Sequence, residues 1–163
     1  MATTEFQESG LRFLFDTERI TEPDTLPQKG LQGVKGCDFI WRKSPSKVWL
    51  VEVKSSAPRS GSELRGYLDE LRDKFIHSLL LWLARGSGRH AHIAMPAALT
   101  VPEAFRATPQ CVLVVSGLPD SSLFELQTAL QQTLRPICRA FDMPPVLAIG
   151  AERAARHFTL AGA

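Results

Sequence analysis

Residues 36–56, GCDFIWRKSPSKVWLVEVKSS, constrain the fold of this chain more than any other stretch. Two apolar runs, CDFIW and VWLVEV, flank the turn-rich sequence RKSPSK, and this pattern predicts a β-hairpin. A hairpin whose turn is centred on Pro45 pairs Asp38 with Glu52. Two carboxylates are therefore expected to face each other across otherwise apolar strands.

The alternation of side chains along a strand sorts the hairpin into two faces. Asp38, Glu52 and Lys54 are expected to share one of them. The other face, which we expect to be the better core face, is lined by Phe39, Trp41, Trp49, Val51 and Val53. A slip of one residue in the register would exchange the two faces.

Two facing carboxylates repel each other unless positive charge lies nearby. Lys54 supplies some of that charge, and a divalent cation would supply more. Mg²⁺ accepts one or two carboxylates together with water and substrate phosphate. Asp38 and Glu52 are therefore the predicted ligands, and the backbone carbonyl of Val53 could add a further oxygen. Lys54 would orient or help deprotonate the attacking water, or stabilise charge on the scissile phosphate.

The order of a strand aspartate, a turn and Glu-x-Lys at the end of an apolar strand resembles the core motif of the PD-(D/E)XK nuclease superfamily, which includes restriction-type endonucleases. Asp38 and Glu52-Val53-Lys54 match that motif within residues 34–56, with 13 residues between the two acids. The resemblance implies a restriction-endonuclease-like fold and a Mg²⁺- or Mn²⁺-dependent nuclease that acts on DNA in preference to RNA.

The chain departs from this family in three places. Cys37 stands where a proline is common, which the family tolerates. Members often add an acidic residue from an N-terminal helix, which is not evident here. Glu8 is our candidate for that residue and Glu5 the alternative, although Glu8 could equally be an ordinary solvated glutamate. The Gln-x-x-x-Tyr signature of the RecB-like branch is absent from ELRGYLDELRDKF, the helical sequence after Lys54.

Basic residues gather around the motif, with six of them against two acids in residues 42–65. The candidate contacts to a nucleic-acid backbone are Arg42, Lys43, Arg59 and Arg65, with Tyr67 and Lys74 as further helix residues that could touch a phosphate. A solvated basic face is the alternative interpretation of such a cluster.

The remaining elements are predicted from hydrophobic periodicity and from Gly and Pro breakers. We expect a strand at 11–16, a loop at 21–33, a long helix at 62–85, a strand at 90–96, a loop or short helix at 98–109, a strand at 111–117, a helix at 123–141, a strand at 143–150 and a weakly helical tail. Asp120, Ser121 or Ser122 is expected to cap the second helix, and Pro136 to kink or split it. This order predicts a single α/β or α+β domain over residues 1–163, with helices packed on a central mixed sheet.

Composition excludes several classes of protein. The 163 residues are 44% hydrophobic and 22% charged, as in soluble globular proteins, and contain no uncharged apolar run long enough to cross a membrane. The N-terminus lacks the layout of a signal peptide, so we expect a cytoplasmic protein without membrane association. Cys37, Cys111 and Cys138 are expected to be reduced and buried, and His90 and His92 lack the further ligands of a zinc site.

The net charge of +2 is small for a protein that binds phosphate backbones. A second hypothesis is therefore a nuclease-like binding module or accessory subunit with a vestigial site, which binds a protein or nucleic-acid partner. For a nuclease of this size there is no room for a separate sequence-reading domain, so specificity would come from loops, from a homodimer or from a protein partner. A third option is an interaction protein whose hairpin acids are merely exposed.

Overall fold

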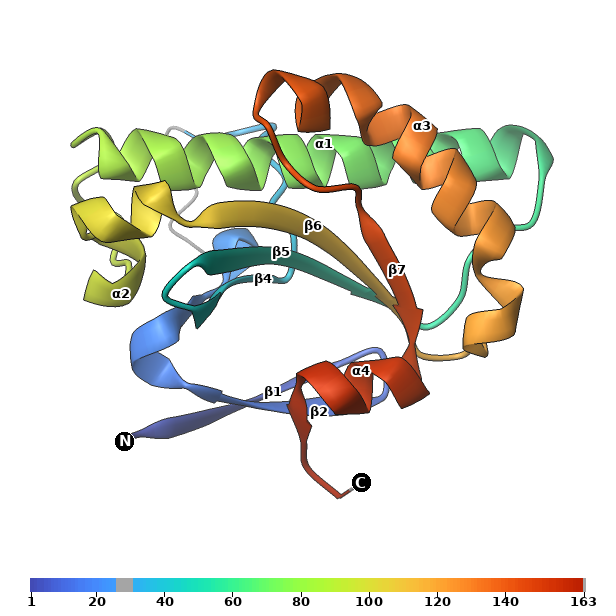
Figure 1. The fold of residues 1–163 in the computed structure, drawn as a ribbon, viewed down its shortest axis with the longest axis horizontal. Coiled ribbons are helices and arrows are strands. Elements are labelled where there is room, and N and C mark those ends of the chain that lie inside the picture. The colour runs from blue at the N-terminus through green and yellow to red at the C-terminus, as the bar shows by residue number, and fades with distance from the viewer. Residues whose placement is uncertain (26–30, 163) are drawn as a thin grey trace.

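A five-stranded mixed sheet forms the centre of the computed structural model, which describes residues 1–25 and 31–162 (Figure 1). Its strands, in spatial order, are β3 (Ile20–Thr21), β4 (Phe39–Ser44), β5 (Lys47–Lys54), β6 (Thr108–Val115) and β7 (Leu147–Gly150). The first three strands are antiparallel, whereas β5, β6 and β7 run parallel to one another. The predicted loop at 21–33 contains a 3-10 turn at Pro23–Thr25, and its residues 26–30 lie outside the described part.

The β4–β5 hairpin has the register that a turn centred on Pro45 predicts. Ile40 pairs with Leu50 and Trp41 pairs with Trp49, with an irregularity near the turn. Asp38 lies in a bend immediately before β4, so its number fits the register although it is not part of the strand.

Two helices cover one face of this sheet, α1 (Gly61–Gly86) and α3 (Phe124–Ala140) (Figure 1). The long helix predicted at 62–85 is confirmed as α1. Its apolar side chains pack with those of α3 and of the sheet in the larger core cluster, which includes Ile40, Leu50, Leu71, Phe75, Leu113 and Leu130. This cluster lies on the Glu52 side of the hairpin, so the expectation that the opposite face would be the better core face was wrong.

A second, smaller layer covers the other face of the central sheet (Figure 1). It consists of the antiparallel strands β1 (Thr3–Glu8), β2 (Leu11–Asp16) and β8 (Thr159–Leu160) together with α4 (Ala151–His157). Its core combines aliphatic side chains of the sheet with a group of aromatic residues, which are Phe13, Phe15, Phe39, Trp49 and Phe158, with Phe6 and Trp41 packed against them. Both faces of the hairpin are covered, and this explains why its strands have apolar residues at nearly every position. The described residues form one α+β domain.

The strand predicted at 90–96 is wrong, because these residues form turns and irregular chain. His90 has a positive φ of 49°, which a strand does not allow. Ile93 is buried beside Leu31 and Leu81 instead of in a sheet. The following region contains α2 (Ala97–Thr100) and a 3-10 turn at Pro102–Arg106, and β6 begins at Thr108 instead of residue 111.

The second long helix is not split at Pro136, since α3 continues to Ala140 with Leu134 and Cys138 buried on either side of the proline. The predicted cap is also wrong. Residues Asp120–Ser122 form a 3-10 turn, Leu123 is the N-cap, and the Asp120 carboxylate accepts a hydrogen bond from the N–H of Gly150 at 3.0 Å.

The two ends of the described chain hold strands that the sequence did not suggest. β1 precedes the confirmed strand at 11–16 and joins it through Ser9 and Gly10, whose φ values of 48° and 81° suit a two-residue hairpin turn. The chain after β2 forms a 3-10 turn at Thr17–Arg19, and β7 is limited to the second half of the strand predicted at 143–150. The tail forms α4 as expected, but it then adds β8 to the edge of β2.

Two expectations from composition can be compared with the fold. Cys37, Cys111 and Cys138 are free and buried, as expected. Within the described ranges, the structure has no helix that is both long and apolar enough to span a membrane.

Candidate active site

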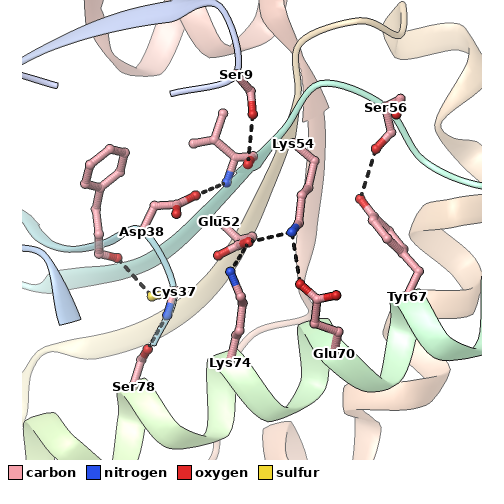
Figure 2. A network of polar contacts seen from close by, with 12 residues as sticks. Ser9, Cys37, Asp38, Glu52, Lys54, Ser56, Tyr67, Glu70, Lys74 and Ser78 are labelled. Carbon is pink, nitrogen blue, oxygen red and sulfur yellow. Dashed lines mark hydrogen bonds and ion pairs between the residues drawn. The ribbon is translucent and has the colours of Figure 1, made fainter. Parts of the chain in front are cut away.

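The acids of the β4–β5 hairpin meet at the end of β5 that lies farthest from the turn (Figure 2). The N–H of Val53 donates a hydrogen bond of 2.7 Å to Oδ2 of Asp38, which fixes this carboxylate against β5. Nζ of Lys54 lies 3.1 Å from Oε1 of Glu52. The structure therefore brings together the three side chains that the sequence predicts to share a face.

Glu52 is the most deeply buried charged residue of this group, with 1% of its side chain exposed. Its Oε1 accepts hydrogen bonds from two ammonium groups, those of Lys74 at 2.7 Å and of Lys54 at 3.1 Å. Its Oε2 is buried and has no hydrogen-bond partner among the described residues. A buried carboxylate oxygen without a donor is energetically costly, and such an atom is often a sign of a ligand or of function.

Lys54 lies between two carboxylates, because its Nζ is also 3.1 Å from Oε1 of Glu70. Burial by itself would lower the pKa of Lys54, but the charges and hydrogen bonds of Glu52 and Glu70 outweigh it and raise that pKa. Lys54 is therefore a charged hydrogen-bond donor, which suits it to orient a water molecule or to stabilise an anion better than to act as a base.

The contribution of α1 to the site was largely missed by sequence reasoning. Glu70 and Lys74 lie one helical turn apart and both point at the hairpin (Figure 2). Lys74, for which the sequence left open a phosphate contact or an exposed position on the helix, is only 14% exposed and pairs with Glu52. The sequence could have indicated this position, because Glu70 directly precedes Leu71 and Lys74 lies three residues after it, and Leu71 is a fully buried residue of the same helix.

Burial disfavours the charged form of both acids. It raises the pKa of Asp38 to about 6, and the Glu8 carboxylate adds to the effect, while the N–H of Val53 and the charges of Lys74 and Lys54 oppose it. The pKa of Glu52 is also raised, first by burial and then by the charge of Asp38. The two carboxylates therefore lie in one electrostatic unit that favours additional positive charge.

Glu8 lies at the end of β1, half-buried and close enough to the acids to feel their charge. Burial, and after it the carboxylates of Glu52 and Glu22, raises the pKa of Glu8. The alternative candidate, Glu5, is exposed and lies 3.8 Å from Arg12. The structure thus brings Glu8 and not Glu5 to the site, and Glu8 lies on a strand and not on an N-terminal helix.

The carbonyl oxygen of Val53, the third predicted metal ligand, also lies at this end of β5. It accepts a hydrogen bond from Oγ of Ser9 at 3.3 Å. Ser9 is in turn held from the other side, since its own carbonyl accepts from Oγ of Ser116 at 2.6 Å. A carbonyl oxygen has a second lone pair, so this contact leaves Val53 able to accept once more.

The segment before Asp38 is anchored to α1 by two side chains. Oγ of Ser78, which is fully buried, accepts from the N–H of Cys37 at 2.8 Å (Figure 2). Nδ1 of His77 accepts from the N–H of Lys35 at 3.0 Å, so this histidine has a structural contact of its own. These bonds fix the chain that delivers Asp38 to the site.

The four candidate nucleic-acid contacts separate into two groups. Arg42 donates to the carbonyls of Ala98 and Pro45, and Nζ of Lys43 lies 3.5 Å above the ring of Trp49. Both belong to the turn end of the hairpin, about 20 Å from Lys54 for a strand rise of ~3.3 Å per residue. Arg59 and Arg65 are exposed; Arg59 lies in the loop after β5 and Arg65 near the start of α1, so of the four candidates these two lie on the chain that leaves the acidic end of β5.

Over residues 1–25 and 31–162, no group of three or more His, Cys, Asp or Glu residues is arranged to hold a metal ion, and His90 and His92 contact only each other's rings. The donors available at the candidate site are two carboxylates and one carbonyl. A hard divalent cation such as Mg²⁺ fits oxygen donors of this kind, and the unpartnered Oε2 of Glu52 offers it a position.

Comparisons of the chain with models of protein families, with curated proteins and with solved structures found no match. What Asp38, Glu52 and Lys54 can do therefore follows from their own chemistry.

Proposed function

We propose that this protein is a Mg²⁺- or Mn²⁺-dependent nuclease of the PD-(D/E)XK superfamily, which hydrolyses phosphodiester bonds in DNA in preference to RNA. One observation carries the proposal. Glu52 is almost fully buried with one oxygen unpartnered, and it lies beside Asp38 and a charged Lys54. Perturbed ionisable groups of this kind cluster at functional sites more often than elsewhere.

Each residue has a chemical task in this proposal. Asp38, Glu52 and the carbonyl of Val53 would hold the divalent cation, with Glu8 as the auxiliary acid. The bound cation would supply a Lewis acid that stabilises negative charge on the phosphate and makes a water molecule more acidic. Lys54 would donate a hydrogen bond to the attacking water or to a phosphate oxygen, and Glu70 would hold its ammonium group in place.

The topology agrees with the proposal without being specific for it. The β4–β5 hairpin, the helix α1 and the parallel strand β6 follow one another in the order expected for the family's mixed core. Many unrelated activities use mixed sheets covered by helices, so the fold alone does not identify the reaction. The support comes from the side chains at the end of β5.

A nuclease-like binding module is the second candidate. It is favoured by the two lysines that already neutralise Glu52 without any cation, and by the engagement of Arg42 and Lys43 in contacts within the protein. In this case the domain would bind a protein or nucleic-acid partner, or a second copy of itself, and its acids would have a structural role.

Cleavage assays distinguish the two candidates. Single- and double-stranded DNA and RNA are incubated with Mn²⁺ and either the wild type, Lys54→Ala or Lys47→Ala, an exposed lysine at the opposite end of the same strand. The nuclease proposal expects cleavage that Lys54→Ala reduces by at least about a hundredfold and that Lys47→Ala leaves unchanged. Absence of Lys54-dependent cleavage on all four substrates would refute catalysis by this protein.

Calorimetry provides an independent measurement. Titration with Mn²⁺ is expected to give a binding isotherm for the wild type that Asp38→Ala abolishes. If the wild type binds no Mn²⁺ and cleaves nothing, the binding module becomes the better description.

A further inference from the structure

Lys74 makes the shortest ion pair of the site, with Nζ 2.7 Å from Oε1 of Glu52. It comes from α1 and not from the hairpin, and no motif assigns it a task. In the described part of the chain, Glu52 is the only hydrogen-bond partner of its ammonium group. By contrast, Lys54 is held by Glu70 as well as by Glu52.

We propose that Lys74 and the divalent cation compete for Glu52, and that Lys74 moves to the substrate phosphate when the cation binds. This inference rests on the proposed nuclease function, to which it adds a phosphate-binding residue. It also makes the binding of cation and of nucleic acid interdependent.

The competition follows from the distribution of charge around Glu52. Oε1 of Glu52 already faces two ammonium groups, whereas Oε2 has no hydrogen-bond partner within residues 1–25 and 31–162. A cation at the free oxygen would have two positive neighbours on the same carboxylate, inside a site where burial strengthens every charge interaction. Either one of the two lysines therefore moves away from Glu52 when the cation binds, or the cation binds more weakly.

Lys74 is the lysine that can withdraw. Leaving Glu52 would cost it a single ion pair, whereas Lys54 would also have to leave Glu70. Its four-carbon side chain lets the ammonium group move while α1 stays in place. Its side chain is 14% exposed, so part of it is already in contact with solvent.

A substrate phosphate is the anion that would receive the displaced ammonium group. The carboxylates that interact with the charge of Lys74 are those of Glu52, Asp38, Glu8 and Glu70. The cation would neutralise Asp38 and Glu52, and Glu70 already pairs with Lys54. A phosphate held by the same cation brings fresh negative charge to the site, and lysine is a common phosphate ligand. Each of the two ligands then strengthens the binding of the other, as reciprocal coupling requires.

Titrations with Mn²⁺ in the absence of nucleic acid test the competition. Wild type, Lys74→Met, Lys74→Gln and Arg72→Gln are compared by calorimetry; Arg72 lies on the same helix but pairs only with the exposed acids Asp69 and Asp73. Both Lys74 variants are expected to bind Mn²⁺ about tenfold or more tightly, because a like charge is removed from the site. Arg72→Gln is expected to match the wild type. Lys74→Gln keeps a hydrogen-bond donor to Glu52, so it tests the charge even if Lys74→Met folds poorly.

A short labelled DNA duplex then tests the coupling. Its addition is expected to tighten Mn²⁺ binding to the wild type and to have little effect on the Lys74 variants. Unchanged or weaker Mn²⁺ binding by both Lys74 variants would overturn the inference, as would equal tightening by DNA in all proteins. If the wild type binds Mn²⁺ and Asp38→Ala abolishes this binding, the proposed metal site is supported and only the role of Lys74 is refuted. If no protein binds Mn²⁺ through Asp38, the proposed function fails with it.

Discussion

The backbone N–H of Val53 donates a hydrogen bond to Oδ2 of Asp38 at 2.7 Å. This contact ties the acid at the start of one strand to the backbone of the strand that carries Glu52 and Lys54. The distance between the two carboxylates is therefore set by the hairpin register and by one additional bond, and not by flexible side chains alone. Pre-organisation of this kind is what a metal or phosphate site requires.

The raised pKa of Asp38 predicts a pH-dependent stability. Its value of about 6 in the folded protein, against the ordinary 3.8, means that the folded state binds a proton more tightly than the unfolded state. The stability that this proton contributes is fully present below about pH 4 and is lost as the pH rises through about 6, by an amount on the order of 2 kcal/mol. Urea denaturation at several pH values in the presence of a chelator measures it.

Asp38→Asn is the matched control, since its side-chain oxygen still accepts from the N–H of Val53 but does not titrate. The unfolding free energy of Asp38→Asn minus that of the wild type should increase as the pH is raised from about 4 to about 7, because only the wild type loses the stability contributed by the Asp38 proton. A constant difference over that range would show that Asp38 titrates normally in the folded protein.

Ser78→Ala is expected to destabilise the protein by about 1–3 kcal/mol, because the N–H of Cys37 would be left buried without a partner. The loss should also loosen Asp38, the residue that directly follows Cys37, and so weaken Mn²⁺ binding. Thr128→Ala, which removes an exposed hydroxyl from α3, should change stability by less than about 0.5 kcal/mol. Equal effects of the two substitutions in thermal denaturation would contradict this assignment.

Two glycines of α1 are predicted to respond in opposite directions to alanine. Nothing lies within 4 Å of a Cβ at Gly66, so Gly66→Ala should stabilise the helix by about 0.5–1 kcal/mol. A Cβ at Gly86 would lie 2.1 Å from Cζ of Phe105, whose ring stacks on the buried Trp82. Gly86→Ala should therefore cost about 1–3 kcal/mol, and chemical denaturation of both variants compares the two signs directly.

Phe158 joins the C-terminal segment to the central sheet, and its removal is expected to be costly. The ring is 4% exposed and contacts Phe13, Phe15, Trp41 and Trp49 at centroid distances of 5.3 to 6.2 Å. Phe158→Ala should lower the unfolding free energy by about 3–5 kcal/mol. The exposed Phe124 offers a control, and Phe124→Ala should have little effect. Similar melting temperatures for the two variants would show that this cluster does not stabilise the fold.

The sequence was informative where local pattern and burial agree. The hairpin register could be predicted because apolar alternation on both strands and one proline-containing turn allow few alternatives. The long helix was equally clear, since its buried positions recur at spacings of three and four. Asp38, Glu52 and Lys54 could be grouped on one face for the same reason.

Local pattern was misleading where long-range packing decides. The run around Ile93 has the composition of a strand, but Ile93 is buried against Leu31 and against Leu81 of α1 instead of in a sheet. Pro136 was expected to interrupt α3, yet burial of Leu134 and Cys138 keeps the helix continuous. β8 is a two-residue strand whose partner β2 lies far away along the chain, so local propensity gives it little signal. β1 pairs with the adjacent β2, but its residues are exposed or only partly buried, so its sequence lacks a strong apolar alternation.

By itself, the sequence determined the hairpin, its register and the shared face of two acids and a lysine, because these depend on neighbours within about 20 residues and on the two-residue period of a strand. Only the tertiary structure decided that both faces of the hairpin are buried, that Glu8 and not Glu5 approaches the acids, and that Glu70 and Lys74 belong to the site. These contacts join elements far apart in the sequence. They depend on how α1 and the β1–β2 layer pack against the sheet. The periodicity of α1 indicates which of its faces is buried, but not that this face meets the acids of the hairpin.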